Sequence, residues 1–211
     1  MIQILGKASS INVRKVLWTC AELKLECVQT EYGSGTANTV SSPDFLRLNP
    51  NGMVPVLLDD DVVLWESNTI CRYLSNRYDR NLADRLLPEA AAPRAQVEKW
   101  MDWQATELNT AWRYAFMATV RLSPDHRDLM AIERSVSQWN RLMGIVDQQL
   151  KKTGAWMAGD QFSLADIVIG MSLNRWRMSP IDRPHLPFVD AYEKRLMERE
   201  AYRLYGANGV A

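Results

Sequence analysis

The sequence predicts two domains: an α/β domain with the order β-α-β-α-β-β-α, followed by an all-helical domain. Over residues 1–80 the spacing of apolar residues alternates between the period of strands and that of helices. The stretch from Asn81 to Pro93 contains two prolines and little periodicity, which indicates a linker at 81–92. Helical periodicity then continues through most of residues 93–211. A chain of 211 residues is long enough for two small domains with real cores.

The first domain opens with a strand and a helix. The run IQIL, residues 2–5, is short, apolar and partly β-branched, and Gly6 ends it. Apolar residues then recur at helical spacing at Val13, Val16, Leu17 and Cys20. Ser10 stands where a helix N-cap is useful. We therefore expect a strand at 2–5 and a helix that begins just after Ser10.

The remaining elements of this domain follow in order. ECVQTEY (26–32) predicts a second strand, SPDFLRL (42–48) a short helix, and VPVLLDDDVVLWE (54–66) a hairpin turning at three aspartates. Ser67 opens a last helix with Ile70, Tyr73 and Leu74 on one face. The first two strands should be parallel because a helix connects them, and the hairpin should be antiparallel.

The second domain is expected to contain helices near 89–120, 125–152, 164–177 and 187–199. Six of the eight tryptophans lie in this half, where large aromatic side chains are typical of cores and domain boundaries. Ser163 and Asp166 have the Ser-x-x-Asp spacing of a capping box, and an apolar helical face follows them.

Composition excludes several classes of protein. Lys plus Arg and Asp plus Glu are both 25, so the basic excess of a nucleic-acid-binding protein is absent. No apolar run is long enough to span a bilayer, and the start MIQILGK lacks the pattern of a signal peptide. Three cysteines without a C-x-x-C and only two histidines argue for reduced thiols in the cytoplasm and against a metal site.

The stretch NPNGMVPVLL (49–58) places Pro55 at the entry of a predicted strand. An X-Pro bond is the one peptide bond at which the cis form costs little. A cis bond here would turn the N–H and C=O of Val54 toward a groove, where they could pair with an extended peptide. The alternative is a proline that simply begins an edge strand, and the local sequence alone favours that interpretation.

Glu66 and Ser67 stand at a predicted strand-to-helix junction. Helix N-termini attract carboxylates, and a glutamate beside such a site could pair with an ammonium group. The two residues therefore suit the head group of an α-amino acid. An ordinary serine cap beside a solvated glutamate is the commoner arrangement.

Ser9, Ser10 and Asn12 lie in the loop that enters the first helix. A hydroxyl near a helix N-terminus could donate to a thiolate and lower the pKa of the thiol. Without an accompanying cysteine or histidine, these serines do not indicate a triad-type nucleophile. A loop with a capping serine is the plainer alternative. Together the three signals indicate a short peptide ligand with a free amino-acid end and an anionic group.

The sequence resembles a cytosolic glutathione S-transferase, most closely bacterial theta- or nu-like members that use a hydroxyl and an asparagine in the active loop. The similarity covers nearly the whole chain and rests on ASSINVRKVL, NPNGMVPVL, WESNTICRYL, EKWMDW and GDQFSLADIVIG. It implies a thioredoxin-like first domain, glutathione as co-substrate and no metal. It also implies a homodimer whose other ligand is a small hydrophobic electrophile.

The resemblance implies a role for each matching residue. Ser10 would donate to the glutathione sulfur, Asn12 would assist, and Ser9 is the competing hydroxyl. Glutathione would also contact Met53, Val54, Pro55, Glu66 and Ser67, and the Val54–Pro55 bond would be cis. Asp102 would reach the glutamyl amino group of the ligand in the partner subunit. The electrophile pocket would be bordered by Arg113, Met117 and Trp176.

The expected activity is conjugation of glutathione to an electrophile. One alternative is glutathione-dependent reduction of disulfides or peroxides, and another is a non-catalytic binding protein on the same fold. The sequence identifies neither the second substrate nor the physiological role. Thr39 and Val40 stand where related members often have a histidine, so the group that binds the glycyl carboxylate is also not identified.

Overall fold

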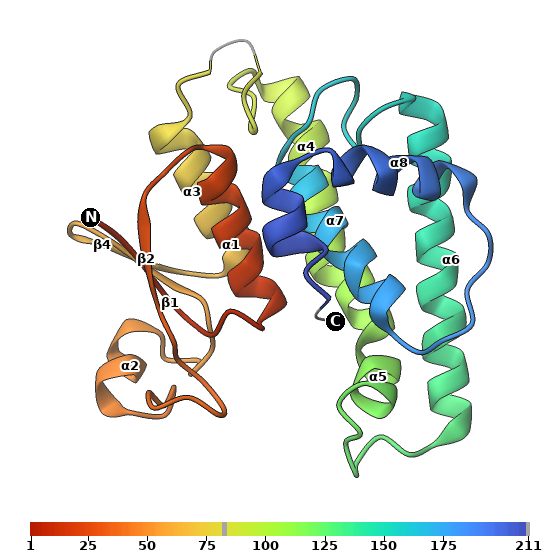
Figure 1. Ribbon diagram of the computed structural model, residues 1–211, viewed down its shortest axis with the longest axis horizontal. Coiled ribbons are helices and arrows are strands. Elements are labelled where there is room, and N and C mark those ends of the chain that lie inside the picture. The colour runs from red at the N-terminus through yellow and green to blue at the C-terminus, as the bar shows by residue number, and fades with distance from the viewer. Residues whose placement is uncertain (82–83, 210–211) are drawn as a thin grey trace.

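The structure is a computed structural model that describes residues 1–81 and 84–209. A four-stranded sheet with three helices comes first in the chain and a helical bundle follows, and the two lie side by side (Figure 1). The first part contains β1 (Ile2–Leu5), α1 (Ile11–Glu22), β2 (Cys27–Thr30), α2 (Pro43–Leu48), β3 (Val56–Asp59), β4 (Val62–Trp65) and α3 (Ser67–Tyr78).

The sheet has the strand order β2-β1-β3-β4. β1 and β2 are parallel, with Ile2 opposite Cys27, whereas β1–β3 and β3–β4 are antiparallel. The hairpin turns at Asp60, whose φ of 54° is the left-handed conformation that such tight turns need. The predicted β-α-β-α-β-β-α order and the predicted strand directions are both confirmed.

The helical part contains α4 (Ala91–Trp103), η1 (Gln104–Leu108), α5 (Asn109–Thr119), α6 (Leu129–Thr153), α7 (Leu164–Met178), α8 (Pro187–Met197) and η2 (Tyr202–Gly206). η1 is a π-helical turn that joins α4 and α5, so the helix expected over 89–120 is one run with an irregular centre. α6 begins at Leu129 instead of near 125 because Asp128 caps it, accepting from the N–H of Met130 at 2.9 Å.

The capping box predicted before α7 is present. The carboxylate of Asp166 accepts from the N–H of Ser163 at 2.9 Å and from its hydroxyl at 3.0 Å. The same carboxylate also accepts from the N–H of Met157 at 2.8 Å and the hydroxyl of Tyr192 at 3.0 Å. Asp166 therefore joins the start of α7 to the preceding loop and to α8. Burial raises its pKa to about 6, although these hydrogen bonds act in the opposite direction.

Trp18 joins the two parts of the molecule. Its ring is fully buried and lies 5.1 Å from the ring of Tyr202, centroid to centroid. It packs so closely on α7 that a Cβ on Gly170 would stand 2.8 Å from its ring. α1 thus lies between the sheet and the helical bundle, and the residues at its N-terminal end are held by both. The predicted linker at 81–92 includes residues 82–83, which lie outside the described residues, and the predicted domain boundaries stay predictions.

Candidate functional site

A pocket of about 240 Å³ opens where the start of α1, the loop before β3 and the start of α3 meet. Six predicted site residues line it, namely Asn12, Met53, Val54, Pro55, Glu66 and Ser67. Asn49 and Asn51, which sequence reasoning did not select, complete the lining. The fold therefore brings together three segments whose residues lie up to 55 positions apart in the sequence, as Asn12 and Ser67 do.

The Val54–Pro55 peptide bond is cis, as predicted. β3 begins only at Val56, so Val54 lies outside the sheet ladder. Within the described residues, neither its N–H nor its C=O takes part in a hydrogen bond. A free donor and a free acceptor on one residue at a pocket wall can pair with one residue of an extended peptide.

Gly6 allows this arrangement. Its φ is 151°, and a Cβ there would come within 2.5 Å of the Val13 side chain and 3.0 Å of the Val54 Cβ. Only glycine fits such a close approach without displacing its neighbours. The sequence marked Gly6 as the end of a strand, but its closer constraint is the approach of its backbone to the side chains of Val13 and Val54.

Asn49 holds the loop before β3 in place. Its side chain is almost fully buried, donates to the carbonyl of Met53 at 2.7 Å and accepts from the N–H of Asn51 at 3.1 Å. Asparagine side chains often form such bonds within turns. The NPNG sequence indicates the turn, but nothing in it shows that Asn49 supports a pocket.

Ser67 is buried at the first position of α3, as predicted, and Glu66 precedes it with an exposed side chain. Glu66 has a φ of 71°, a conformation that costs energy for a residue with a side chain and is often found at functional sites. Within the described part of the chain, its carboxylate makes no hydrogen bond or ion pair. The carboxylate is thus available to a ligand beside the α3 N-terminus.

Ser10 is the N-cap of α1, but its side chain makes no capping hydrogen bond. The hydroxyl of this half-buried residue is therefore free to donate to a ligand. Asn12 lies on the first turn of the helix, where its Oδ1 accepts from the Ser67 hydroxyl at 3.4 Å and leaves its Nδ2 available. Ser9 is exposed. Of these three residues only Asn12 is part of the pocket lining.

The remaining predicted residues lie apart from this pocket. Asp102 is on α4 and forms an ion pair with Arg72 of its own chain. Arg113 and Met117 are on α5, exposed and half-buried respectively. Trp176 is fully buried, and its Nε1 donates to Asn140 at 2.8 Å. Arg113, Met117 and Trp176 thus remain a predicted border for a second substrate.

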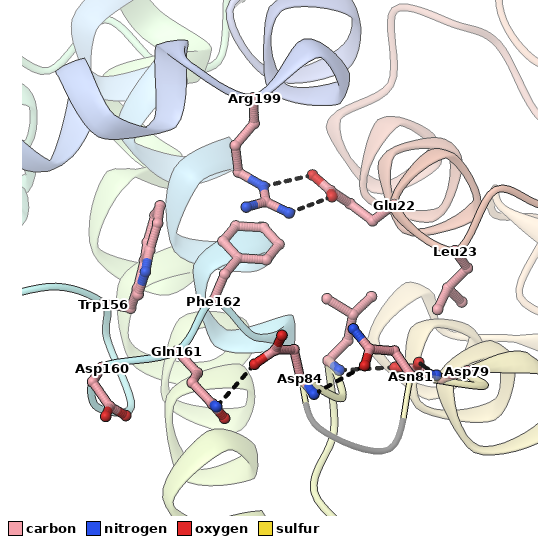
Figure 2. Close-up of a pocket in the computed structure, with 11 residues that line it drawn as sticks. Glu22, Leu23, Asp79, Asn81, Asp84, Trp156, Asp160, Gln161, Phe162 and Arg199 are labelled. Atoms are coloured by element: carbon pink, nitrogen blue, oxygen red, sulfur yellow. Dashed lines mark hydrogen bonds and ion pairs between the residues drawn. The ribbon is translucent and has the colours of Figure 1, made fainter.

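A second pocket, of about 390 Å³, lies at the boundary between the two parts of the molecule (Figure 2). Most of its charged side chains already have partners within the protein. Arg199 forms a two-pronged ion pair with Glu22 at 2.9 and 2.6 Å, and its guanidinium lies 3.7 Å over the ring of Phe162. Asp84 accepts from Gln161 at 2.9 Å.

The cysteines do not contribute to the first pocket. Cys20 and Cys71 are buried in α1 and α3, as expected, and burial raises the pKa of the Cys71 thiol. Among residues 1–81 and 84–209, no group of three or more His, Cys, Asp or Glu side chains could hold a metal ion. The same residues contain no helix that is long and apolar enough to cross a membrane.

The chain belongs to the glutathione S-transferase family. The family model for the glutathione S-transferase N-terminal domain matches residues 2–76, and the model for the C-terminal domain matches residues 110–200. The predicted family and the predicted fold, a thioredoxin-like domain followed by a helical domain, are thereby confirmed.

Individual relatives agree with this assignment. The chain is 39% identical over 206 residues to glutathione S-transferase GstB of Escherichia coli. The aligned residues cover 96% of each protein. Among solved structures, the theta class glutathione S-transferase from Xanthomonas axonopodis pv. citri with glutathione bound superposes with a TM-score of 0.90. That match has 35% identity and covers 100% of this chain and 99% of the other. A disulfide-bond oxidoreductase, YfcG of Escherichia coli, is 26% identical over 194 residues, covering 86% of this chain and 82% of YfcG.

Proposed function

We propose that this protein is a glutathione transferase that activates the glutathione thiol as a thiolate and conjugates it to a small electrophile. The observation that carries the proposal is the pair of backbone groups on Val54 that are unpaired within the described residues, in a pocket also lined by Asn12 and by the Glu66–Ser67 helix start. The relative with glutathione bound adds support, because it covers the whole chain.

In this proposal each part of glutathione meets a matching group. The cysteinyl residue pairs with the N–H and C=O of Val54 in the manner of strand addition. The γ-glutamyl carboxylate is bound by Ser67 at the N-terminus of α3, where unpaired N–H groups and the helix dipole favour an anion. The glutamyl ammonium is bound by the carboxylate of Glu66. Met53 and Pro55 shape the wall beside the ligand.

The thiolate is stabilised by donors at the start of α1. The Ser10 hydroxyl and the Asn12 amide donate to the sulfur, and the N-terminal end of the twelve-residue helix adds partial positive charge. Each unit by which they lower the thiol pKa corresponds to about 1.4 kcal/mol in favour of the charged form. The thiolate then attacks the electrophilic carbon, forms the carbon–sulfur bond and expels a leaving group such as halide.

Ser10→Ala tests which hydroxyl matters. We expect the apparent pKa in the pH profile of kcat/KM, with an aromatic halide as electrophile, to rise by about one unit because the thiolate loses a donor. Ser9→Ala is the matched control, since Ser9 is exposed, and its profile should match that of the wild type. A shift in the Ser9 variant and none in the Ser10 variant would exchange their roles.

Glutathione-dependent disulfide reduction is the second candidate, because a relative is named a disulfide-bond oxidoreductase. In that reaction the same thiolate attacks a disulfide sulfur and expels one thiolate of the substrate. A second glutathione then attacks the mixed disulfide, which releases the other substrate thiolate and glutathione disulfide. Turnover of a small disulfide or a peroxide, measured against an aromatic halide at equal glutathione, separates the two activities. A non-catalytic binding role would become the better account if millimolar glutathione left Tm unchanged.

We also propose a cytoplasmic homodimer with a glutathione-binding domain at 1–80, a linker at 81–92 and a helical domain at 93–211. Asp102 is exposed on α4, which leaves it accessible to a second copy of the chain, where it would reach the glutamyl ammonium. Light scattering on the purified protein tests the dimer. Asp102→Asn tests the contact, with an expected increase of several-fold in the KM for glutathione.

A further inference from the structure

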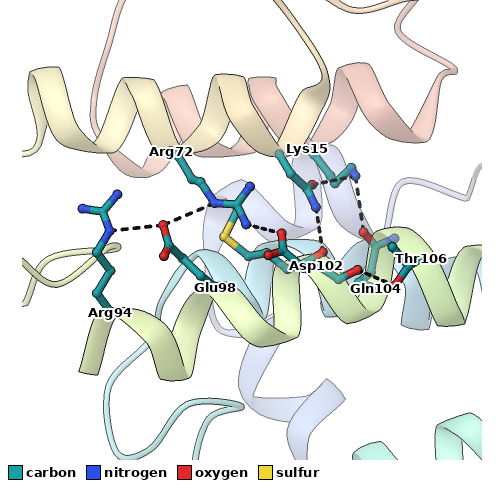
Figure 3. Close-up of polar contacts among 9 residues, drawn as sticks. Lys15, Arg72, Arg94, Glu98, Asp102, Gln104 and Thr106 are labelled. Atoms are coloured by element: carbon teal, nitrogen blue, oxygen red, sulfur yellow. Dashed lines mark hydrogen bonds and ion pairs between the residues drawn. The ribbon is translucent and has the colours of Figure 1, made fainter. Parts of the chain in front are cut away.

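Lys15 is a buried lysine that has no acidic partner. Its side chain is only 2% exposed, and within the described residues it forms no ion pair. Its ammonium donates to Asn68 Oδ1 at 2.9 Å and to Gln104 Oε1 at 3.5 Å (Figure 3). A buried charge is normally paired with an opposite charge, so an ammonium held only by neutral amides calls for an explanation.

The groups bound to Lys15 form a continuous chain across the two parts of the molecule. Asn68 donates to the carbonyl of Met101 on α4 at 2.8 Å. Gln104 donates to the hydroxyl of Ser172 on α7 at 3.0 Å and to Asn109 at 2.9 Å. Lys15 on α1 is therefore hydrogen-bonded to α3 and to the α4–α5 helix, and through Gln104 it is linked to α7.

The position of Lys15 relative to the candidate site is specific. It lies three residues after Asn12 on α1, so the two residues share a helix face. Its direct partner Asn68 follows Ser67 in the first turn of α3. Lys15 is therefore hydrogen-bonded to the first turn of the helix proposed to hold the γ-glutamyl carboxylate, and it lies on the same face of α1 as Asn12.

We propose that Lys15 is a positioning residue for glutathione: through Asn68 it fixes the first turn of α3, and it supplies positive charge behind the γ-glutamyl end. The inference rests on the proposed function, since it takes glutathione as the ligand of the pocket. Binding of the γ-glutamyl carboxylate brings a negative charge to the end of the helix that Lys15 supports. The cost of burying the ammonium is thus partly offset when the ligand is bound.

The surroundings of Lys15 make its charge sensitive to pH. Burial lowers its pKa from 10.5 to about 8, and the charge of Arg175 on α7 acts in the same direction. Cys71 on α3 and Glu66 before α3 act in the opposite direction. The contribution of the Lys15 ammonium to glutathione binding is therefore present below pH 8, and it is lost as the pH rises through that value.

The test compares Lys15→Met with Lys152→Met, an exposed lysine on α6 that serves as the matched control. We expect Lys15→Met to raise the KM for glutathione about tenfold, with kcat changed less than threefold, and Lys152→Met to change neither. Lys15→Gln, which keeps a polar group, should raise KM by a smaller factor and serves if the methionine variant does not fold. A KM equal to that of the wild type in a folded Lys15 variant would overturn the proposal.

The pH dependence supplies a readout that a purely structural role would not move. The probe is S-methylglutathione, which has no thiol to titrate, and its Kd is measured for the wild type and Lys15→Met from pH 6.5 to 9.5. The Kd of Lys15→Met divided by that of the wild type should fall as the pH rises through 8, because the wild type then loses the charge that the variant lacks. A ratio that does not change with pH would contradict a role for the Lys15 charge and would leave the residue only a packing role. If the wild type itself does not bind the probe, the proposed function fails, and the variant data are not needed to show it.

Discussion

Two pockets of this protein, the one beside Pro55 and the one beside Arg199, differ in what their polar groups do. In the larger of the two, at the domain boundary, Glu22 and Arg199 already bind each other in a two-pronged ion pair (Figure 2). In the smaller one, beside Pro55, the backbone of Val54 and the carboxylate of Glu66 are free within the described residues, and so is the hydroxyl of Ser10, two residues before the lining residue Asn12. The smaller pocket is also bordered by the N-termini of two helices.

We infer from this difference that unsatisfied groups are a better guide to the candidate binding site than pocket volume is. Paired charges in a hollow stabilise the boundary between domains, and a ligand would have to break those pairs to bind there. Free donors and acceptors cost stability, so their concentration in one place indicates that a ligand completes them. We therefore expect substitutions at the first pocket to change affinity and those at the second to change stability.

The largest effect is expected when the anion-binding end of the small pocket is removed. Ser67→Ala deletes a buried hydroxyl that would donate to the γ-glutamyl carboxylate, and hydrogen bonds to charged groups contribute about 1.5–3 kcal/mol. The Kd for glutathione, measured by calorimetry, should therefore rise about 10- to 100-fold, whereas Tm should change little. Thr69→Ala is the control, because Thr69 is exposed on the same helix. Equal Kd values for the two variants would contradict the assignment.

At the second pocket, Arg199→Met should lower stability and leave glutathione affinity intact. The substitution removes the two-pronged pair and leaves Glu22, whose side chain is 11% exposed, with only the indole of Trp18 as a donor. A loss of about 2–3 kcal/mol in the free energy of unfolding is expected from urea titration. If the Kd for glutathione instead rose tenfold with stability unchanged, the contrast between the pockets would be wrong.

The smallest effect is expected at Asp160, an exposed aspartate on the rim of the second pocket. Within the described residues it forms no hydrogen bond or ion pair. Asp160→Asn should therefore change the free energy of unfolding by less than about 0.5 kcal/mol and should not change the Kd for glutathione. A measurable loss of affinity in this variant would indicate that the second pocket takes part in binding.

The sequence predicted those features that depend on neighbouring residues. The run of apolar residues predicted the observed bounds of β1, and the turn residues predicted the hairpin. The Ser-x-x-Asp spacing predicted the capping box before α7. The cis bond before Pro55 followed from combining three motifs, because the local sequence favoured an ordinary strand start. The π-helical turn η1 and the later start of α6 depend on packing and capping that the period of apolar residues does not record.

The roles and contacts that sequence reasoning missed depend on side-chain burial and hydrogen bonding, which the period of apolar residues does not record. Asn49 reads as a turn residue, yet its buried amide holds the carbonyl of Met53. Lys15 reads as a charged residue on an amphipathic helix, yet it lies in the boundary between the two parts of the molecule, 53 residues in sequence from its partner Asn68. Asp102 was expected to face a partner subunit, and its ion pair with Arg72 could be seen only in three dimensions. The contacts of Lys15 and Asp102 depend on which helix packs opposite.

A crystal structure with glutathione bound is the most direct test of the central claim, that the free groups beside Pro55 bind this tripeptide. The account predicts two backbone hydrogen bonds between the cysteinyl residue and Val54, the γ-glutamyl carboxylate at Ser67, and the sulfur within hydrogen-bonding distance of Ser10 or Asn12. Glutathione in the pocket beside Arg199, or bound with the backbone of Val54 still unpaired, would contradict it.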